Sequence, residues 1–340
     1  MTVDQDQPAK SEEGASLHGT QPILRVEGLR VRIGKGDSAV RALRGVSLEL
    51  PPEAITGLVG ESGCGKTMTG LSILRLLPKE GRITGGRISF GELDLTAMSE
   101  KEMREIRGAR ISMIFQNAPQ ALNPLFTVGD QIARVYQLHK NVSRREALEM
   151  AVEMLDHMGV PDAADMAREY PHRFSGGMAQ RAMIAMALVC SPELLIGDEP
   201  TTGLDVTIEA QVLDLIVRVV CESKASMLLI SHDMGVIART CQHVAVMYAG
   251  EIVEHGPVDE VFENPQHPYT RGLLSCVELG EDNRMRYVPG VVPDLRQPLN
   301  HCAFAPRCSV SNDLCWAQVP NLYWVDGSHA VGCHAVESGE

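Results

Sequence analysis

The residues that bear most directly on chemistry form a glycine-rich stretch at residues 60–67, GESGCGKT, which fits G-x-x-x-x-G-K-[ST]. The stretch follows the apolar run AITGLVG and precedes TMTGLSILRLL, so we expect a loop between a buried strand and a helix. Such a loop turns backbone N–H groups and a helix N-terminus toward phosphate oxygens. Lys66 would reach the β- and γ-phosphates, and the Thr67 hydroxyl would bind Mg²⁺. A glycine turn that binds nothing is the alternative, and the flanking strand and helix argue against it. The candidate nucleotide-binding residues here are Gly60, Ser62, Gly63, Cys64, Gly65, Lys66, Thr67 and Met68.

A pair of adjacent carboxylates ends a second apolar run. Residues 193–198 read ELLIGD, and Glu199 and a proline follow. A buried strand delivers such groups to the carboxyl edge of a parallel sheet, where a phosphate loop also lies. We therefore expect Asp198 to hold Mg²⁺ through water and Glu199 to polarise the water that attacks the γ-phosphate. Two solvated acids at a strand end would be the better interpretation if the phosphate loop were not upstream.

A second glycine-rich helix start lies shortly before that strand, at residues 174–181, FSGGMAQR. Ser175 is expected to cap the helix, and Gly176 and Gly177 leave its N-terminus open, which makes a second anion-binding site. One nucleotide does not need two such sites from one subunit. We infer that this one serves the nucleotide of a partner subunit, so that ATP lies between two subunits.

The elements that must position these residues alternate between strands and helices. Strands are expected at 23–33, 46–50, 54–60, 193–198 and 226–233, helices at 143–158 and 177–189, and a hairpin at 243–256. This order predicts a parallel α/β core with a mostly helical insert near 119–172. Residues 1–22 are polar and are expected to form a disordered leader, and prolines punctuate the chain beyond about residue 263.

Composition excludes several classes of protein. The 340 residues carry a net charge of −13, which argues against a general binder of nucleic acid or anionic lipid. No run approaches the roughly 18 apolar residues that a membrane span needs, and the N-terminus lacks the apolar region of a signal peptide. We therefore expect a cytosolic protein that meets any membrane through a partner.

Together the motifs resemble those of the ATP-binding-cassette (ABC) ATPases over roughly residues 23–256. Six family motifs occur in order: phosphate loop, glutamine loop, S-G-G-x-x-Q-R signature, Asp-Glu strand, D-loop and switch histidine. Gln116 matches the glutamine loop, Asp205 the D-loop and His232 the switch histidine. Ile33 lies near the position where family members carry an adenine-stacking aromatic residue, and Gly203 stands where alanine is more usual.

The resemblance implies a P-loop ATPase core, in which a RecA-like parallel sheet joins an antiparallel β subdomain. It implies a nucleotide-binding domain at 23–262 with a helical subdomain at about 119–189, and ATP and Mg²⁺ as ligands. The catalytic residues it implies are Glu199, His232 and Gln116. The nucleotide contacts added to the loop are Asp198, Ser175, Gly176, Gly177, Gln180 and Asp205, and the Mg²⁺ ligands are Thr67, Gln116 and Asp198.

Four cysteines, Cys302, Cys308, Cys315 and Cys333, cluster near the C-terminus with spacing C-x5-C-x6-C-x17-C. Four thiolates in a proline-rich segment suggest a metal or iron–sulfur site, although the spacing is not that of a zinc ribbon. The stretches at 267–274, 288–295 and 304–308 resemble the C-terminal extension of oligopeptide/dipeptide transporter ATPases, some of which carry a [4Fe–4S] cluster. We expect such a metal-binding extension at 263–340, with zinc and four unligated thiols as alternatives.

These features predict the ATP-hydrolysing subunit of a bacterial ABC importer for di- or oligopeptides or similar small solutes. The resemblance implies a second, related but distinct ATPase subunit, two permease subunits and an extracytoplasmic binding protein, and a location at the cytoplasmic face of the plasma membrane. Residues 123–132, NPLFTVGDQI, resemble the permease-coupling region of that group. The alternatives are a soluble ABC ATPase outside transport and an importer of metal chelates such as nickel.

Overall fold

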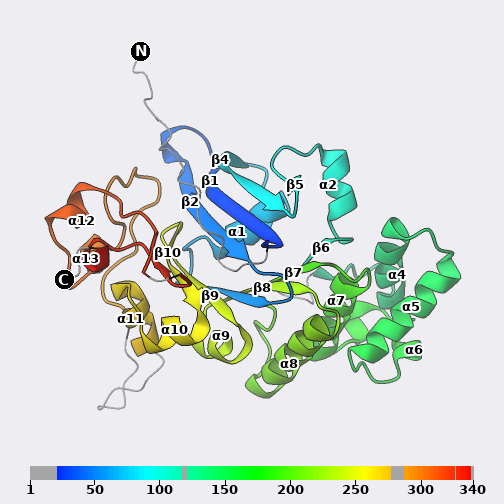
Figure 1. The fold of residues 1–340 in the computed structure, drawn as a ribbon. Coiled ribbons are helices and arrows are strands. Elements are labelled where there is room, and N and C mark those ends of the chain that lie inside the picture. The colour runs from blue at the N-terminus through cyan, green and yellow to red at the C-terminus, as the bar shows by residue number, and fades with distance from the viewer. Residues whose placement is uncertain (1–20, 117–120, 277–286, 326, 338–340) are drawn as a thin grey trace.

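The structure is a computed structural model that describes residues 21–116, 121–276, 287–325 and 327–337. The leader expected at 1–22 lies almost entirely outside the described residues. The central sheet contains five parallel strands in the order β6-β7-β8-β3-β9 (Figure 1). Their bounds are β3 (Ile55–Val59), β6 (Ile111–Ile114), β7 (Leu194–Asp198), β8 (Ser226–Ser231) and β9 (His243–Tyr248). Every residue of β3, β6, β7 and β8 is buried, because helices or a second sheet cover both faces, and this explains their unbroken apolar runs.

Four helices pack on this sheet and connect its strands: α1 (Lys66–Ile73), α7 (Gly176–Leu188), α8 (Val206–Glu222) and α9 (Met234–Thr240). Helix α1 lies between the parallel sheet and a smaller antiparallel sheet of order β2-β1-β4-β5. The strands of the smaller sheet are β1 (Leu24–Ile33), β2 (Val40–Leu50), β4 (Gly81–Phe90) and β5 (Leu93–Asp94). One apolar core joins Leu48 and Phe90 of this sheet to Ile73 of α1 and Ile196 of the parallel sheet. The expected α/β core with an antiparallel β subdomain is confirmed.

A helical subdomain projects to one side of the core (Figure 1). It contains α4 (Val128–His139), α5 (Arg144–His157) and α6 (Ala163–Met166), and α7 joins it to the sheet, while α2 (Glu100–Ile106) lies beside β6. Ser143 and Glu146 form the capping box expected at the start of α5. Ala147, Ala151 and Leu155 bury one face of that helix. The helical insert is therefore confirmed.

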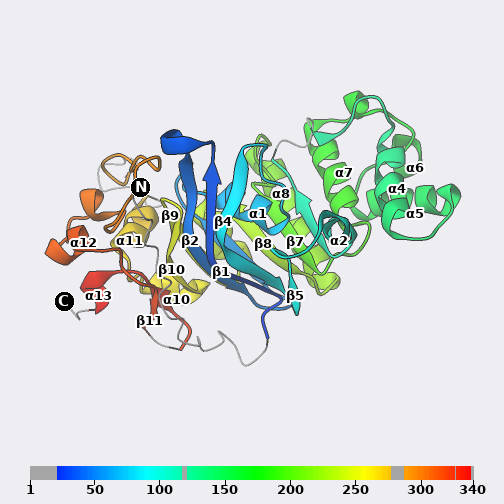
Figure 2. The same ribbon diagram turned by 90° about the horizontal axis from the view of Figure 1, so that it is seen from above.

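The C-terminal region packs on the opposite side of the core from the helical subdomain (Figure 2). Its elements are β10 (Glu251–Pro257), α10 (Val258–Glu263), α11 (Pro268–Ser275), α12 (Asp313–Ala317), β11 (Tyr323–Trp324), β12 (Ala330–Val331) and α13 (His334–Glu337). A short 3-10 turn at Ala305–Arg307 also belongs to this region, and two others occur earlier in the chain, at Gly36–Ser38 and Pro171–Arg173. Strands β9 and β10 form the expected hairpin, and β12 pairs with β10. Ala303 and Phe304 belong to the core that the parallel sheet shares with its helices. The extension is thus packed into the body of the protein.

Candidate functional site

The glycine-rich loop joins β3 to α1, as its sequence predicts. Gly65 caps α1 with φ +114°, and a Cβ there would lie 2.8 Å from the Ala42 carbonyl oxygen. A Cβ on Gly60 would lie 2.1 Å from the carbonyl oxygen of Met247. Both glycines are therefore required by the close approach of other backbone segments. Ser62 and Gly63 are exposed, whereas Met68 is half-buried against the core of the smaller sheet.

Lys66 is almost fully buried at the start of α1. Its Nζ donates hydrogen bonds to the carbonyl oxygens of Gly60, at 2.7 Å, and Glu61, at 3.2 Å. These bonds hold the ammonium against the backbone of the loop. The Cys64 side chain is 1% exposed, and burial raises the pKa of its thiol, so this residue packs as a neutral apolar group.

The two expected Mg²⁺ ligands Thr67 and Asp198 lie side by side. The Thr67 hydroxyl donates to Asp198 Oδ1 at 3.1 Å. Asp198 ends β7 and is 4% exposed, and this burial raises the pKa of its carboxyl. A buried carboxylate beside a hydroxyl is suited to a divalent cation, which offsets the cost of burying the negative charge.

Glu199 contacts the other two predicted catalytic residues. Its carboxylate accepts from Gln116 Nε2 at 3.1 Å and lies 3.1 Å from His232 Nδ1. The Thr202 hydroxyl also donates to it, at 2.9 Å. Glu199 has φ +45°, an uncommon conformation for a residue with a side chain, which turns its backbone sharply after β7. The structure therefore brings Gln116, Glu199 and His232 together, and adds Thr202, which the motifs did not indicate.

A small cavity of about 290 Å³ lies beside this cluster and is lined by Glu199, His232 and residues of the 200–204 turn. Asp205, the D-loop match, follows this turn and caps α8 by accepting from the Ile208 N–H at 3.1 Å. Thr202 belongs to this turn. The only signal that could have found it is its place three residues after Glu199.

The serine cap expected at the start of α7 is present. Ser175 Oγ accepts from the Met178 N–H at 3.3 Å, and Ser175 and Gly176 are exposed, while Gly177 is half-buried. Gln180 is buried, and its amide donates to the Pro200 carbonyl oxygen. Within this chain Gln180 therefore ties α7 to the segment after Glu199.

Of the tail cysteines, Cys315 lies within α12 and its backbone contacts that of Cys302. The Cys302 N–H donates to the Cys315 carbonyl oxygen at 2.9 Å, and Cys315 and Cys333 are buried. Burial, with a smaller effect of the neighbouring thiols, raises the pKa of Cys302 to about 11 and raises that of Cys308. In the described part of the chain, however, no set of three or more His, Cys, Asp or Glu side chains is arranged to hold a metal ion.

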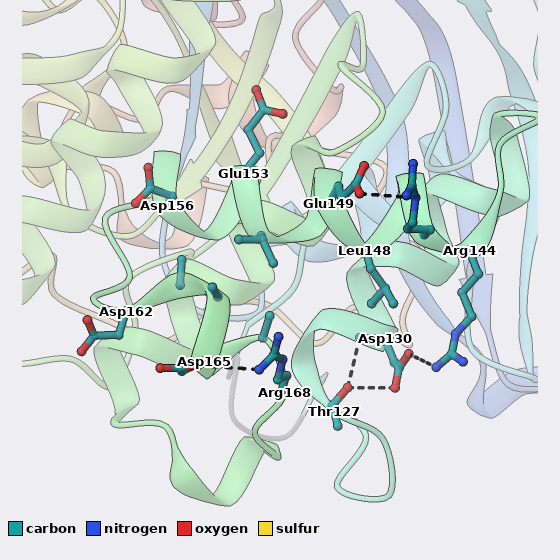
Figure 3. Close-up of a pocket in the computed structure, with 15 residues that line it drawn as sticks. Thr127, Asp130, Arg144, Leu148, Glu149, Glu153, Asp156, Asp162, Asp165 and Arg168 are labelled. Carbon is teal, nitrogen blue, oxygen red and sulfur yellow. Dashed lines mark hydrogen bonds and ion pairs between the residues drawn. The ribbon is translucent and has the colours of Figure 1, made fainter.

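A larger cavity, of about 930 Å³, lies in the helical subdomain between α4, α5 and α6 (Figure 3). Its rim carries ion pairs between Asp130 and Arg144, at 2.8 Å, and between Asp165 and Arg168, at 3.9 Å. The residues that line it include none of those expected to bind nucleotide or Mg²⁺. This cavity is therefore separate from the candidate site.

Two family models match the chain. Residues 43–202 match the ABC transporter model, and residues 253–315 match the oligopeptide/dipeptide transporter C-terminal region. The chain is 50% identical to the probable peptide ABC transporter ATP-binding protein y4tR of Sinorhizobium fredii, over 92% of this chain and 94% of that protein. It is 45% identical to the dipeptide transport ATP-binding protein DppD of Bacillus subtilis, over 94% of this chain and 99% of that protein.

Solved structures agree on the fold. The dimeric ATP-binding cassette MJ0796 bound to ADP and phosphate superposes with a TM-score of 0.62 at 22% identity, over 69% of this chain and 98% of that one. CbiO1 of Clostridium perfringens, part of the CbiONQ transporter complex, gives 0.61 at 25% identity, over 72% of this chain and 92% of that one.

The fold and the site define an ABC-type ATPase. The chain belongs to the ABC transporter family and carries the C-terminal region of its oligopeptide/dipeptide transporter members. Its activity is accordingly the hydrolysis of ATP. No helix among the residues described is long and apolar enough to cross a bilayer.

Proposed function

We propose that this protein is the ATP-hydrolysing subunit of a bacterial importer for di- or oligopeptides, acting at the cytoplasmic face of the plasma membrane. The observation that carries the proposal is a nucleotide site and a peptide-transporter C-terminal region in one chain. Relatives named for peptide or dipeptide transport match it over more than nine-tenths of its length, which supports the same solute class.

In the proposed reaction, the N–H groups of residues 60–67 and the Lys66 ammonium bind the triphosphate. Thr67 and Asp198, with Gln116 nearby, would hold Mg²⁺, which neutralises charge that develops on the phosphates. The carboxylate of Glu199 accepts a proton from the attacking water, and His232 and Gln116 orient that carboxylate. The Glu199 carboxylate lies at the same strand end as Asp198, which suits it to act at the terminal phosphate.

The site requires a second subunit for completion. The exposed Ser175 and Gly176 at the start of α7 would face the terminal phosphate held by a partner ATPase, as Asp205 would face that subunit. The dimeric cassette MJ0796, whose fold this chain shares, supports this arrangement. We propose that the partner is a related but distinct ATPase chain.

A permease would dock beside Gln116. Three large apolar side chains are exposed on either side of Gln116 along the sequence: Phe115 at 41%, Leu125 at 77% and Phe126 at 56%. Exposed aromatic and aliphatic side chains near a site that moves during hydrolysis are typical of a contact with another protein. We propose that two permease subunits take up this contact and that a binding protein delivers the solute to them.

Transport in proteoliposomes tests the function. The protein, its partner ATPase and the permeases encoded beside it would be reconstituted with the adjacent binding protein, and uptake of labelled di- and oligopeptides would be measured with ATP on the ATPase side. We expect uptake that requires ATP and stops with Lys66→Ala. Recovery of the chain only in the soluble fraction of cells that express those permeases would instead support an ATPase outside transport.

We further propose that Cys302, Cys308, Cys315 and Cys333 bind a structural [4Fe–4S] cluster. The support is the donor chemistry: four thiols lie within residues 302–333, and four cysteine thiolates are the usual ligands of such a cluster. Anaerobic purification should give a brown protein with broad visible absorbance and about four iron atoms per chain. Zinc without iron, or a colourless metal-free protein, would reject the cluster.

A further inference from the structure

Glu61, the second residue of the phosphate loop, is held by residues of the C-terminal region. Its carboxylate accepts two hydrogen bonds from the Arg307 guanidinium, at 2.7 and 2.9 Å. Its backbone N–H donates to the phenolic oxygen of Tyr269 at 2.9 Å. These partners lie 246 and 208 residues along the chain from Glu61. The C-terminal region therefore contacts both the side chain and the main chain of Glu61 in the phosphate loop.

Arg307 is itself fixed on several sides. Its side chain is 3% exposed, and it donates to the carbonyl oxygens of Pro289, at 2.8 Å, and Val288, at 2.7 Å. It also donates to the hydroxyl of Tyr248 at 3.3 Å. A buried guanidinium with two parallel bonds to a carboxylate and further bonds to carbonyls has little freedom to move. The pair is therefore better ordered than a surface ion pair.

A packed cluster of aromatic rings supports the contacts that Arg307 and Tyr269 make with Glu61. The rings of Tyr248, Tyr269 and Phe304 have centroids 4.6 to 5.4 Å apart, and all three residues are buried. Tyr248 ends β9, Tyr269 belongs to α11, and Phe304 lies in the extension near Arg307. Aromatic packing of this kind makes the cluster a stiff support for the loop.

The ion pair between Arg307 and Glu61 also affects the charge of the phosphate loop. A carboxylate in a loop that binds a triphosphate repels that ligand unless a cation neutralises it. Arg307 forms an ion pair with the Glu61 carboxylate. Its loss would therefore loosen the loop and leave an uncompensated negative charge beside the phosphates.

We propose that Arg307 and Tyr269 are positioning residues for the phosphate loop, through which the C-terminal extension sets the affinity of this subunit for ATP. The inference rests on the proposed function, in which residues 60–67 bind the triphosphate. The apparent Kd for ATP equals the intrinsic Kd divided by the fraction of molecules whose loop is in the binding conformation. A loop that is already held in that conformation therefore binds ATP with its full intrinsic affinity. The extension raises that fraction and cancels the charge of Glu61.

Binding of a fluorescent ATP analogue and steady-state hydrolysis by the full-length protein test this role. Arg307→Gln should raise the Kd and KM for ATP about tenfold, as expected when the competent loop falls to a tenth of the population. The kcat at saturating ATP should change much less, because Glu199 and His232 are untouched. Adding Glu61→Gln to Arg307→Gln should recover part of the affinity, since it removes the unpaired charge. A purely structural defect would not be rescued by a second substitution.

The matched control is Arg110→Gln. Arg110 forms a two-bond pair with Glu193 at the opposite, amino edge of the parallel strands, so its loss should leave the Kd unchanged. Tyr269→Phe removes only the hydroxyl that accepts from the Glu61 N–H, and it should raise the Kd for ATP by a few fold. This variant keeps the test decisive if Arg307→Gln does not fold.

The outcomes separate the two proposals. Wild-type affinity in both folded Arg307→Gln and Tyr269→Phe, with binding abolished by Lys66→Ala, would overturn the positioning role and leave the nucleotide site intact. Full binding by Lys66→Ala would overturn the assignment of the phosphate loop itself.

Discussion

Glu199 shows how much of the chemistry depends on a single residue, because three neighbours converge on its carboxylate. Gln116, Thr202 and His232 approach its two oxygens at 2.9 to 3.1 Å, which fixes the direction in which it can accept a proton. Glu199→Gln keeps the size and the hydrogen-bonding capacity of the side chain but cannot act as a base. We expect hydrolysis to fall about 10²- to 10⁴-fold while ATP binding persists.

Phosphate release and equilibrium binding of a fluorescent ATP analogue measure the two effects separately. Glu193→Gln, at the amino edge of the parallel strands, is the control for the loss of a carboxylate and should hydrolyse ATP normally. Turnover close to that of the wild type in Glu199→Gln would mean that another group accepts the proton.

Asp198 links the Mg²⁺ site to stability. Burial raises the pKa of this carboxyl above the ordinary value near 3.8, so the folded protein holds the proton more tightly than the unfolded chain. The free energy of unfolding therefore falls as the pH rises from that value through the raised pKa, and it stays lower above it. Asp198→Asn removes this loss and keeps an acceptor for Thr67.

Thermal unfolding without nucleotide or Mg²⁺ should consequently show a higher Tm for Asp198→Asn than for the wild type at pH 7, with the difference shrinking toward pH 4. Addition of Mg·ATP should raise the Tm of the wild type more than that of the variant, because only the wild type offers the buried carboxylate to the cation. A variant less stable than the wild type at pH 7 would show that the charge of Asp198 is stabilising.

The order of the family motifs was enough to predict Gln116 and His232 as catalytic residues together with Glu199, whereas Thr202 matches no motif and was not predicted. Nothing comparable predicts the contacts of Glu61, since Arg307 and Tyr269 lie more than 200 residues away and match no motif of phosphate binding. Such contacts arise from the tertiary packing of the extension. The tail cysteines illustrate a different limit, because spacing indicates a donor set and leaves open which metal, if any, it holds.

Among the elements, those with a strong periodic or apolar signal were predicted well. The expected strands at 193–198 and 226–233 and the helix at 143–158 match β7, β8 and α5 to within two residues at each end. Strand β4 was missed, since Gly85 and Gly86 interrupt its alternation and mark a shift in its pairing with β1. The two-residue strands β11 and β12 carry no signal of their own and form because β10 offers an edge.

Helix α7 offers a test of the second anion site, because α5 provides a cap of the same type elsewhere. Ser175 and Ser143 each accept one backbone N–H at 3.3 Å from their helix N-termini. Ser175→Ala and Ser143→Ala should each cost about 1 kcal/mol of stability. Only Ser175→Ala should also lower hydrolysis and nucleotide-dependent pairing, since only that helix start would contact a partner's nucleotide. Equal ATPase activities of the two variants would place the site elsewhere.

At the scale of the molecule, the two candidate anion sites belong to one chain but would serve different nucleotides in the proposed complex. The phosphate loop follows β3, whereas Ser175 begins α7 where the helical subdomain joins the sheet. ATP held by one subunit therefore completes its contacts only when a second cassette approaches. Binding should close the pair, and hydrolysis should reopen it, because the terminal phosphate is the group that both subunits share.

The Glu199→Gln protein should accordingly remain paired in Mg·ATP, since it binds the nucleotide without removing the terminal phosphate. The molar mass can be measured by light scattering after size exclusion, both for this chain alone and for this chain mixed with its partner ATPase. We expect the mass of a two-cassette complex in Mg·ATP and that of single subunits in Mg·ADP. Lys66→Ala in this chain, combined with replacement of the matching phosphate-loop lysine of the partner, is the control. The two chains should then not pair, because neither binds nucleotide. Single subunits under every condition, despite measured ATP binding, would show that the nucleotide does not bridge two chains. The exposed start of α7 would then need another ligand.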